Sequence, residues 1–165
     1  MLVESSNETG GAYTLIEVEL QPGGGNKLHY HTSFSEKFIA VKGELCIAVG
    51  SQEIHLQPGE SLLVAVGKLH KFYNKSEKPI IFQVKLTPGH EMFEHGLAIA
   101  YGLAKDGKLN PRGIPKNWDH MALLMSFTDT GVPGFFSFIR PIMKWRARKA
   151  MEKGLHLELI KKYCR

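Results

Sequence analysis

The sequence has little cysteine: its 165 residues include only Cys46 and Cys164. Two cysteines provide no disulfide framework, and reduced thiols fit an intracellular protein. The chain also lacks an apolar run near the ~18 residues that a membrane span requires. Its first residues, MLVESSNETGG, have neither the basic start nor the apolar stretch of a signal peptide. Together these absences predict a cytoplasmic protein.

Excess positive charge is absent from most of the chain, although the net charge is +5. Residues 144–165 hold eight Lys or Arg against two Glu, which leaves thirteen Lys or Arg against fourteen Asp or Glu in residues 1–143. No recognised nucleic-acid reader motif accompanies the basic end. We therefore expect no nucleic-acid partner.

Residues 12–87 contain short segments in which apolar and polar side chains alternate, as in TLIEVEL, and no helical spacing. Turn residues recur about every ten residues, which is typical of a β-sandwich or barrel. Strands are expected in AYTLIEVEL, KLHYH, KFIAVKG, ELCIAVG, SQEIHL, SLLVAV, LHKF and PIIFQVKL. The fold class predicted for this section is mainly β.

The pattern becomes helical after Thr87-Pro88-Gly89. Helices are expected at 90–107, at 118–127 behind an Asn117 cap, at 135–153 and at 155–163. The predicted domains are 1–87 and 88–165, with the helices packed on the strands as one structural unit. An apolar stripe is expected to dock on the strands with its basic side solvated, although a membrane-surface helix is an alternative; the stripe comprises Phe135, Phe138, Ile139, Ile142 and Met143.

His29 and His31 lie one residue apart in the stretch LHYHTSFSE. On a strand, side chains two positions apart point the same way and can converge on one ion. Glu36 would face away on an unbroken strand, but Thr32, Ser33 and Ser35 predict a break that turns it inward. Two imidazoles and a carboxylate suit divalent iron or manganese. A solvent-facing strand with incidental histidines is the alternative.

The wider spacing around this stretch is G-x5-H-x-H-x4-E-x6-G, running from Gly23 to Gly43. A second run starts at Gly59, reaches Gly67 and His70, and ends at Asn74. The two runs resemble the paired signature motifs of the cupin superfamily, in its small single-domain form with a helical C-terminal extension. One position departs from that pattern, because Ala65 stands where the family has proline.

The resemblance implies a double-stranded β-helix, the jelly-roll barrel of cupins, with helices packed on it. It implies one divalent metal ion per chain, held by His29, His31, Glu36 and His70. Iron, manganese or nickel is favoured, with zinc or cobalt as alternatives. Phe38 and Phe72 share faces with Glu36 and His70 and are candidates to line a substrate pocket.

The function predicted from the resemblance is a small-molecule metalloenzyme, a quercetinase-like dioxygenase in which Glu36 is both ligand and catalytic proton acceptor. A metal-dependent sugar or keto-acid isomerase or lyase, and a non-catalytic small-molecule-binding protein, stay open as alternatives. A homodimer is expected, because cupins often associate through barrel faces. A zinc-protease helix is not expected, since His90 and His95 are five residues apart instead of four.

Overall fold

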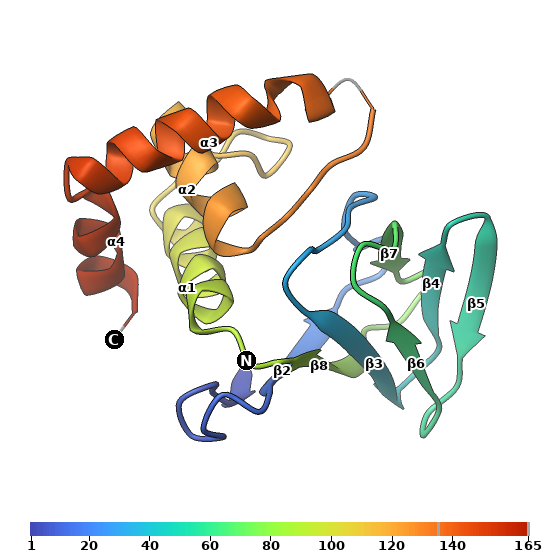
Figure 1. Ribbon diagram of the computed structural model, residues 1–165. Helices are drawn as coiled ribbons and strands as arrows, with labels where there is room; N and C mark the ends of the chain where they lie inside the picture. Colours follow the sequence, from blue (N-terminus) through green and yellow to red (C-terminus); the bar gives the residue numbers. More distant parts are fainter. Residues whose placement is uncertain (135, 165) are drawn as a thin grey trace. The chain divides into compact units, whose positions relative to one another are not determined.

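The computed structural model describes residues 1–134 and 136–164 and forms two compact units, residues 1–91 and 92–165 (Figure 1). We call them the sheet unit and the helical unit, because the first contains the strands and the second the helices. The predicted boundary at residue 87 is the end of the last strand, and the sheet unit continues to residue 91. Packing of the helices on the strands stays a prediction.

Two antiparallel sheets make up the sheet unit, in the orders β1-β2-β8-β3-β6 and β5-β4-β7. This arrangement confirms the mainly β fold class. The strands are β1 Leu2–Glu4, β2 Thr14–Leu20, β3 Ser35–Lys42, β4 Leu45–Val49, β5 Gln52–Leu56, β6 Ser61–Val64, β7 His70–Tyr73 and β8 Ile80–Thr87. Strands β2 to β8 lie where the alternation predicts them.

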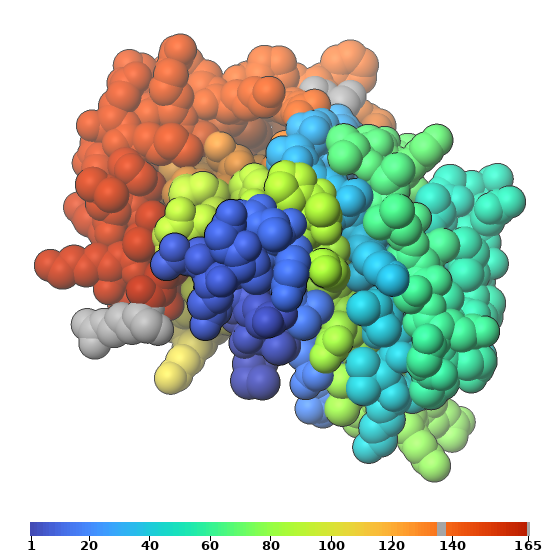
Figure 2. All heavy atoms as spheres, turned by 60° about the horizontal axis from the view of Figure 1, so that its bottom comes forward, coloured from blue at the N-terminus to red at the C-terminus, as the bar shows by residue number. Residues whose placement is uncertain are grey.

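The expected strand KLHYH is wrong, because this segment makes isolated bridges, such as the one between His29 and His70 of β7, instead of a continuous ladder. Asn26 provides the reason. Its backbone N–H donates to the carbonyl of Phe72 at 3.1 Å, while its side-chain oxygen accepts from the N–H of Phe72 at 2.8 Å. A side-chain acceptor thus replaces the backbone acceptor that a regular ladder would use. The sequence also gave no sign of β1, a three-residue strand at the exposed start of the chain (Figure 2, dark blue).

The core of the sheet unit lies between the two sheets. Phe38 on β3 and Phe82 on β8 project from the five-stranded sheet, and Phe72 on β7 projects from the three-stranded one. The ring of Phe72 lies 5.0 Å from that of Phe82 and 5.9 Å from that of Phe38, measured between centroids. Aromatic contacts at this separation stabilise the pairing of the layers beyond simple burial.

The turn from β3 to β4 needs Gly43, whose φ is +77°. A Cβ at this position would lie 2.6 Å from Cγ2 of Ile80, a buried residue of β8. Both the backbone conformation and the close approach therefore favour glycine. The predicted role of this motif glycine as a tight corner is confirmed.

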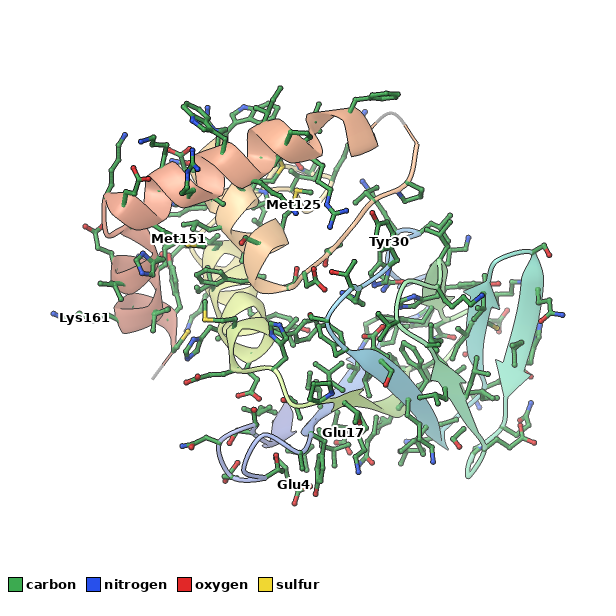
Figure 3. The ribbon with its side chains drawn as sticks, in the orientation of Figure 1. Glu4, Glu17, Tyr30, Met125, Met151 and Lys161 are labelled. Carbon is green, nitrogen blue, oxygen red and sulfur yellow. The ribbon has the colours of Figure 1, made fainter. Side chains whose placement is uncertain are left out.

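The helical unit contains α1 Glu91–Lys105, α2 Trp118–Phe127, α3 Phe136–Glu152 and α4 Leu155–Tyr163. Asn117 caps α2 as predicted, because its side-chain oxygen accepts from the N–H groups of Asp119 and His120 at 2.7 and 3.2 Å. Met125 and Met151 pack against the buried core, while Lys161 is exposed (Figure 3). That core is formed by Ile99, Leu103, Ala122, Leu123, Phe127, Met143, Ala147, Ala150 and Leu159. Within the described residues, no helix has the length and apolar character needed to cross a membrane.

The predicted apolar stripe on the third helix needs correction. Met143 is buried and Ile139 packs against the core of the helical unit, but Phe138 and Ile142 are 78% and 58% exposed. The physical reason is helical periodicity: residues 138 and 142 lie on the side opposite to residues 143, 147 and 150. Phe135 lies outside the described residues.

Candidate metal centre

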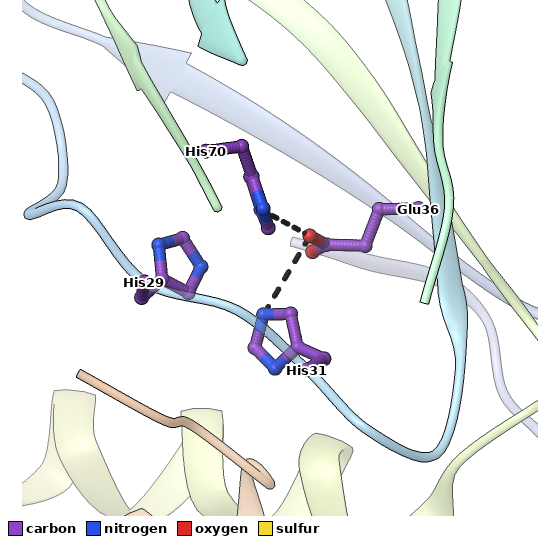
Figure 4. Close-up of side chains that lie close together, drawn as sticks. All are labelled: His29, His31, Glu36 and His70. Carbon is purple, nitrogen blue, oxygen red and sulfur yellow. Dashed lines mark ion pairs between the residues drawn. The ribbon is translucent and has the colours of Figure 1, made fainter. Parts of the chain in front are cut away.

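Four side chains predicted as ligands come from three segments of the sheet unit (Figure 4). Glu36 follows the first residue of β3 and is buried on the same side as Phe38 and Ala40, as predicted from the break before it. His70 begins β7. His29 lies opposite His70, and their backbones exchange two hydrogen bonds, of 3.0 and 2.9 Å. The backbone pairing itself brings these two imidazoles together.

The ligand atoms of the four side chains lie within 4.8 Å of one another. Nε2 of His70 is 2.6 Å from Oε2 of Glu36, and Nε2 of His31 is 3.5 Å from the same oxygen. All four residues are buried, with exposed fractions of 9% or less. The structure therefore brings together every residue that the sequence predicted, while ligation itself stays a prediction.

Two of the imidazoles are oriented by backbone carbonyls. Nδ1 of His29 lies 2.9 Å from the carbonyl oxygen of Lys27, and Nδ1 of His70 lies 2.9 Å from that of Lys68. A carbonyl only accepts, so Nδ1 carries the proton in both rings and donates it. In the neutral ring Nε2 then has a free lone pair, and this arrangement is the usual support of histidine ligands.

Burial changes the protonation of these rings. It lowers the pKa of His29 to about 4, with additional effects from His70 and His31, so this imidazole is neutral at physiological pH. Burial also opposes the charged form of His70, but the adjacent carboxylate of Glu36 outweighs it and raises the pKa of His70 above 6.5. The lone pair of His29 is thus available to a cation.

The cluster suits a metal ion because it contains buried polar atoms that lack hydrogen-bond partners. Oε2 of Glu36 and Nε2 of His70 are buried, and within the described residues neither makes a hydrogen bond of good geometry, although they are 2.6 Å apart. Their contact is therefore an electrostatic one. Buried polar atoms without aligned partners are costly, and a cation shared with the other imidazoles would satisfy them. Three nitrogen donors and one carboxylate suit a divalent transition metal.

A narrow hollow adjoins the cluster, lined by His31, Phe34, Glu36, Val64, Ala65 and His70. Phe34 was missed by the sequence reading, because it lies between two serines in a predicted break. It is 1% exposed, and its ring stacks on His31 at 4.6 Å between centroids. Phe38 and Phe72 instead belong to the core between the sheets, although the ring of Phe38 contacts that of His70 at 5.9 Å.

The other histidines and the other hollow take no part in this cluster. His90 precedes α1 and packs edge-on against Phe34, so it does not share a helix face with His95. A larger hollow of about 240 Å³ lies in the helical unit, lined by residues of α2, α3 and the segment between them. Among the described residues no metal-ligating cluster accompanies it. The cluster predicted from the sequence therefore lies wholly in the sheet unit.

Comparison with known proteins supports the assignment of the fold. A family model described as "Cupin domain" matches residues 16–87. No curated protein matches the chain. The solved structures that do match cover about half of the chain. An uncharacterized conserved protein with a double-stranded β-helix domain from Klebsiella pneumoniae is 21% identical, with a TM-score of 0.47, over 53% of this chain and 74% of that one.

Two further matches carry protein names. KdgF from Halomonas sp. is 14% identical over 55% of this chain and 78% of that one, with a TM-score of 0.50. A protein titled sugar phosphate isomerase from a cupin superfamily, from Silicibacter pomeroyi, is 26% identical over 52% of this chain and 57% of that one, with a TM-score of 0.46. Similarities of this size concern the fold alone.

Proposed function

Residues 16–87 of this chain are a cupin domain, and we propose that this domain binds one divalent transition metal and acts as a small-molecule dioxygenase. The observation that supports the proposal is the convergence of three imidazoles and one carboxylate in a buried cluster. Iron, manganese or nickel fits this donor set best, with zinc and cobalt as alternatives.

The proposed ligands are His29, His31, Glu36 and His70. A bound ion of this kind would supply Lewis acidity and coordination positions open to substrate and dioxygen. The hollow beside the cluster has no room for a ligand while its side chains stay in place, whereas pockets that enclose drug-sized molecules measure ~300–1,000 Å³. We therefore expect side chains around the hollow to move when the reacting part of the substrate enters it.

The surrounding residues have separate roles in this proposal. The carbonyls of Lys27 and Lys68 hold two imidazoles in the orientation that directs Nε2 toward the cluster. The stacked ring of Phe34 fixes His31 and excludes water from one side. Glu36 is both a ligand and the group closest to His70, so its carboxylate is the candidate to accept a proton from the substrate.

The test begins with elemental analysis of the purified protein beside a His31→Ala, His70→Ala double variant. His156→Ala is the matched control, because this residue lies on α4 of the helical unit. We expect about one equivalent of iron, manganese or nickel per chain, lost in the double variant and kept in the control. Failure of the wild-type protein to bind any of these metals, also on soaking, would refute the metal-centre proposal.

An oxygen electrode then tests the reaction class. The metal-loaded protein is screened against flavonols and small keto acids, with the double variant as the blank. Oxygen uptake by the wild-type protein alone supports the dioxygenase. Metal-dependent conversion of a sugar or keto acid without oxygen uptake would refute the dioxygenase and indicate an isomerase or lyase. Retention of a ligand without turnover would indicate a non-catalytic binding protein.

A further inference from the structure

A second group of side chains that could ligate a metal lies on the three-stranded sheet, apart from the cluster of His29, His31, Glu36 and His70. Cys46 on β4 is directly opposite His55 on β5 in the antiparallel register. Glu44 comes two residues before Cys46, so it approaches the same face. The neighbouring positions Leu45 and Ile47 are 0% exposed in the core. The three side chains therefore gather on the face opposite to the core.

The distances between the three donor atoms resemble those around a tetrahedral ion. Sγ of Cys46 lies 3.6 Å from Nδ1 of His55 and 3.8 Å from Oε1 of Glu44, and these last two atoms are 2.8 Å apart. Zinc bonds of ~2.3 Å to sulfur and ~2.0–2.1 Å to nitrogen and oxygen place tetrahedral donors about 3.4–3.6 Å apart. The two sulfur distances are close to these values, whereas Nδ1 of His55 and Oε1 of Glu44 are in hydrogen-bond contact at 2.8 Å and would move apart by about 0.6 Å on binding the ion.

The side-chain atoms of His55 and Glu44 that point away from Cys46 also have partners. Nε2 of His55 lies 2.9 Å from Oε1 of Glu53, and Oε2 of Glu44 accepts a hydrogen bond of 2.6 Å from the amide of Gln57. A carboxylate on the far nitrogen of a histidine is the usual outer support of a metal ligand. Glu53 is fixed in turn by an ion pair with Lys75. Each of these contacts leaves the inner donor atom directed at the shared space.

We propose that Glu44, Cys46 and His55 form a second metal site, for a thiophilic divalent ion such as Zn²⁺, with a fourth position open to water. The side chains of Glu44 and His55 are 40% and 44% exposed, so an ion reaches the site from solvent. Cys46 is buried at the base of the site, 1% exposed. Binding replaces the protons on the thiol and on Nδ1 with the ion, while Nε2–H still donates to Glu53.

Cobalt is the probe, because a Co²⁺–thiolate bond absorbs light by charge transfer and the four residues of the cupin cluster include no sulfur. We titrate the full-length protein with Co²⁺ and then displace the cobalt with Zn²⁺. The expected result is a thiolate band that saturates with one cobalt ion per chain beyond any cobalt held by the first centre, and that disappears on addition of Zn²⁺. The His31→Ala, His70→Ala variant should keep this band, which separates the second site from the proposed cupin centre.

Variants test the assignment of each residue, with folding checked by circular dichroism. Cys46→Ser should abolish the band, whereas Cys164→Ser, the matched control on the other cysteine, should keep it. Glu53→Gln leaves the three ligands in place and should weaken binding by about 10–100-fold, the effect of losing an outer support. No thiolate band in the wild-type protein, or a band that survives in Cys46→Ser, would overturn the proposal and leave the three residues as an ion-pair network.

Discussion

Replacing Gly102 by alanine should destabilise the helical unit, although alanine is the better helix former. Gly102 lies on α1 beneath the ring of Tyr163 from α4. An added Cβ would lie 2.1 Å from Cδ1 and 2.6 Å from Cγ of that ring, well inside the ordinary contact distance of 3.4 Å. The ring cannot simply swing aside, because the tyrosine hydroxyl donates to Oδ2 of Asp106 at 2.7 Å.

Two opposing effects determine the size of the change. Alanine in place of glycine inside a helix gains about 1 kcal/mol. Overpacking of a filled contact costs about 1–3 kcal/mol, and the upper part of that range applies because the Cβ meets Cγ, close to the tyrosine backbone. We expect Gly102→Ala to lower the free energy of unfolding by about 1–2 kcal/mol. In a Tyr163→Ala background the same change should raise it by about 1 kcal/mol.

Urea denaturation followed by tryptophan fluorescence measures this effect, because both tryptophans, Trp118 and Trp145, lie on helices of the helical unit. The four proteins of the double-mutant cycle should show a coupling energy of about 2–3 kcal/mol. A Gly102→Ala effect of the same sign in both backgrounds would show that the ring does not pack on Gly102 as described.

Three further predictions concern the site and the supports of each unit. Phe34→Leu should weaken metal binding by about tenfold without unfolding the protein, because His31 loses its stacked support; unchanged affinity in a metal titration would contradict this role. Asn74→Ala should cost about 2–4 kcal/mol in denaturation followed by circular dichroism, since a buried amide that bonds two carbonyls is removed; a loss below 1 kcal/mol would argue against it. Hydrogen bonds from Lys162 and from the neighbouring tyrosine lower the pKa of Asp106 below 3.8, so its contribution to stability is complete above pH 3.8 and is lost as the pH falls through the lowered pKa. Asp106→Asn should therefore destabilise the protein at pH 7, with a difference from wild type that shrinks as the pH falls below 3.8; a difference independent of pH would show that the charge has no part in it.

Much of the fold and of the cupin cluster could be predicted from local patterns. Alternation in some segments and turn residues about every ten residues located strands β2 to β8, and the break after His31 predicted that Glu36 turns inward with Phe38. Such features depend on neighbours along the chain, which the sequence displays directly. The resemblance to the cupin motifs then added His70 from a distant segment.

The features that the sequence did not reveal depend on the register between strands and on side chains that take the place of backbone hydrogen-bond partners. Cys46 and His55 are nine residues apart, and only the β4–β5 pairing places them opposite each other. Asn26 interrupts the expected strand around His29 with its own amide oxygen, which no periodicity encodes. Phe34 looked like part of a polar break, because serines flank it. Its contact with the ring of His31 depends on the fold, so the sequence did not reveal it. The homodimer and the substrate stay predictions.

The candidate ligands belong to both layers of the sandwich. Glu36 is on β3 of the five-stranded sheet, while His70 and the backbone-paired His29 belong with β7 of the three-stranded sheet. An ion bound by all four would therefore act as a removable cross-link between the layers. Removing the ion would take this cross-link away, so the free energy of unfolding should fall when the metal is removed.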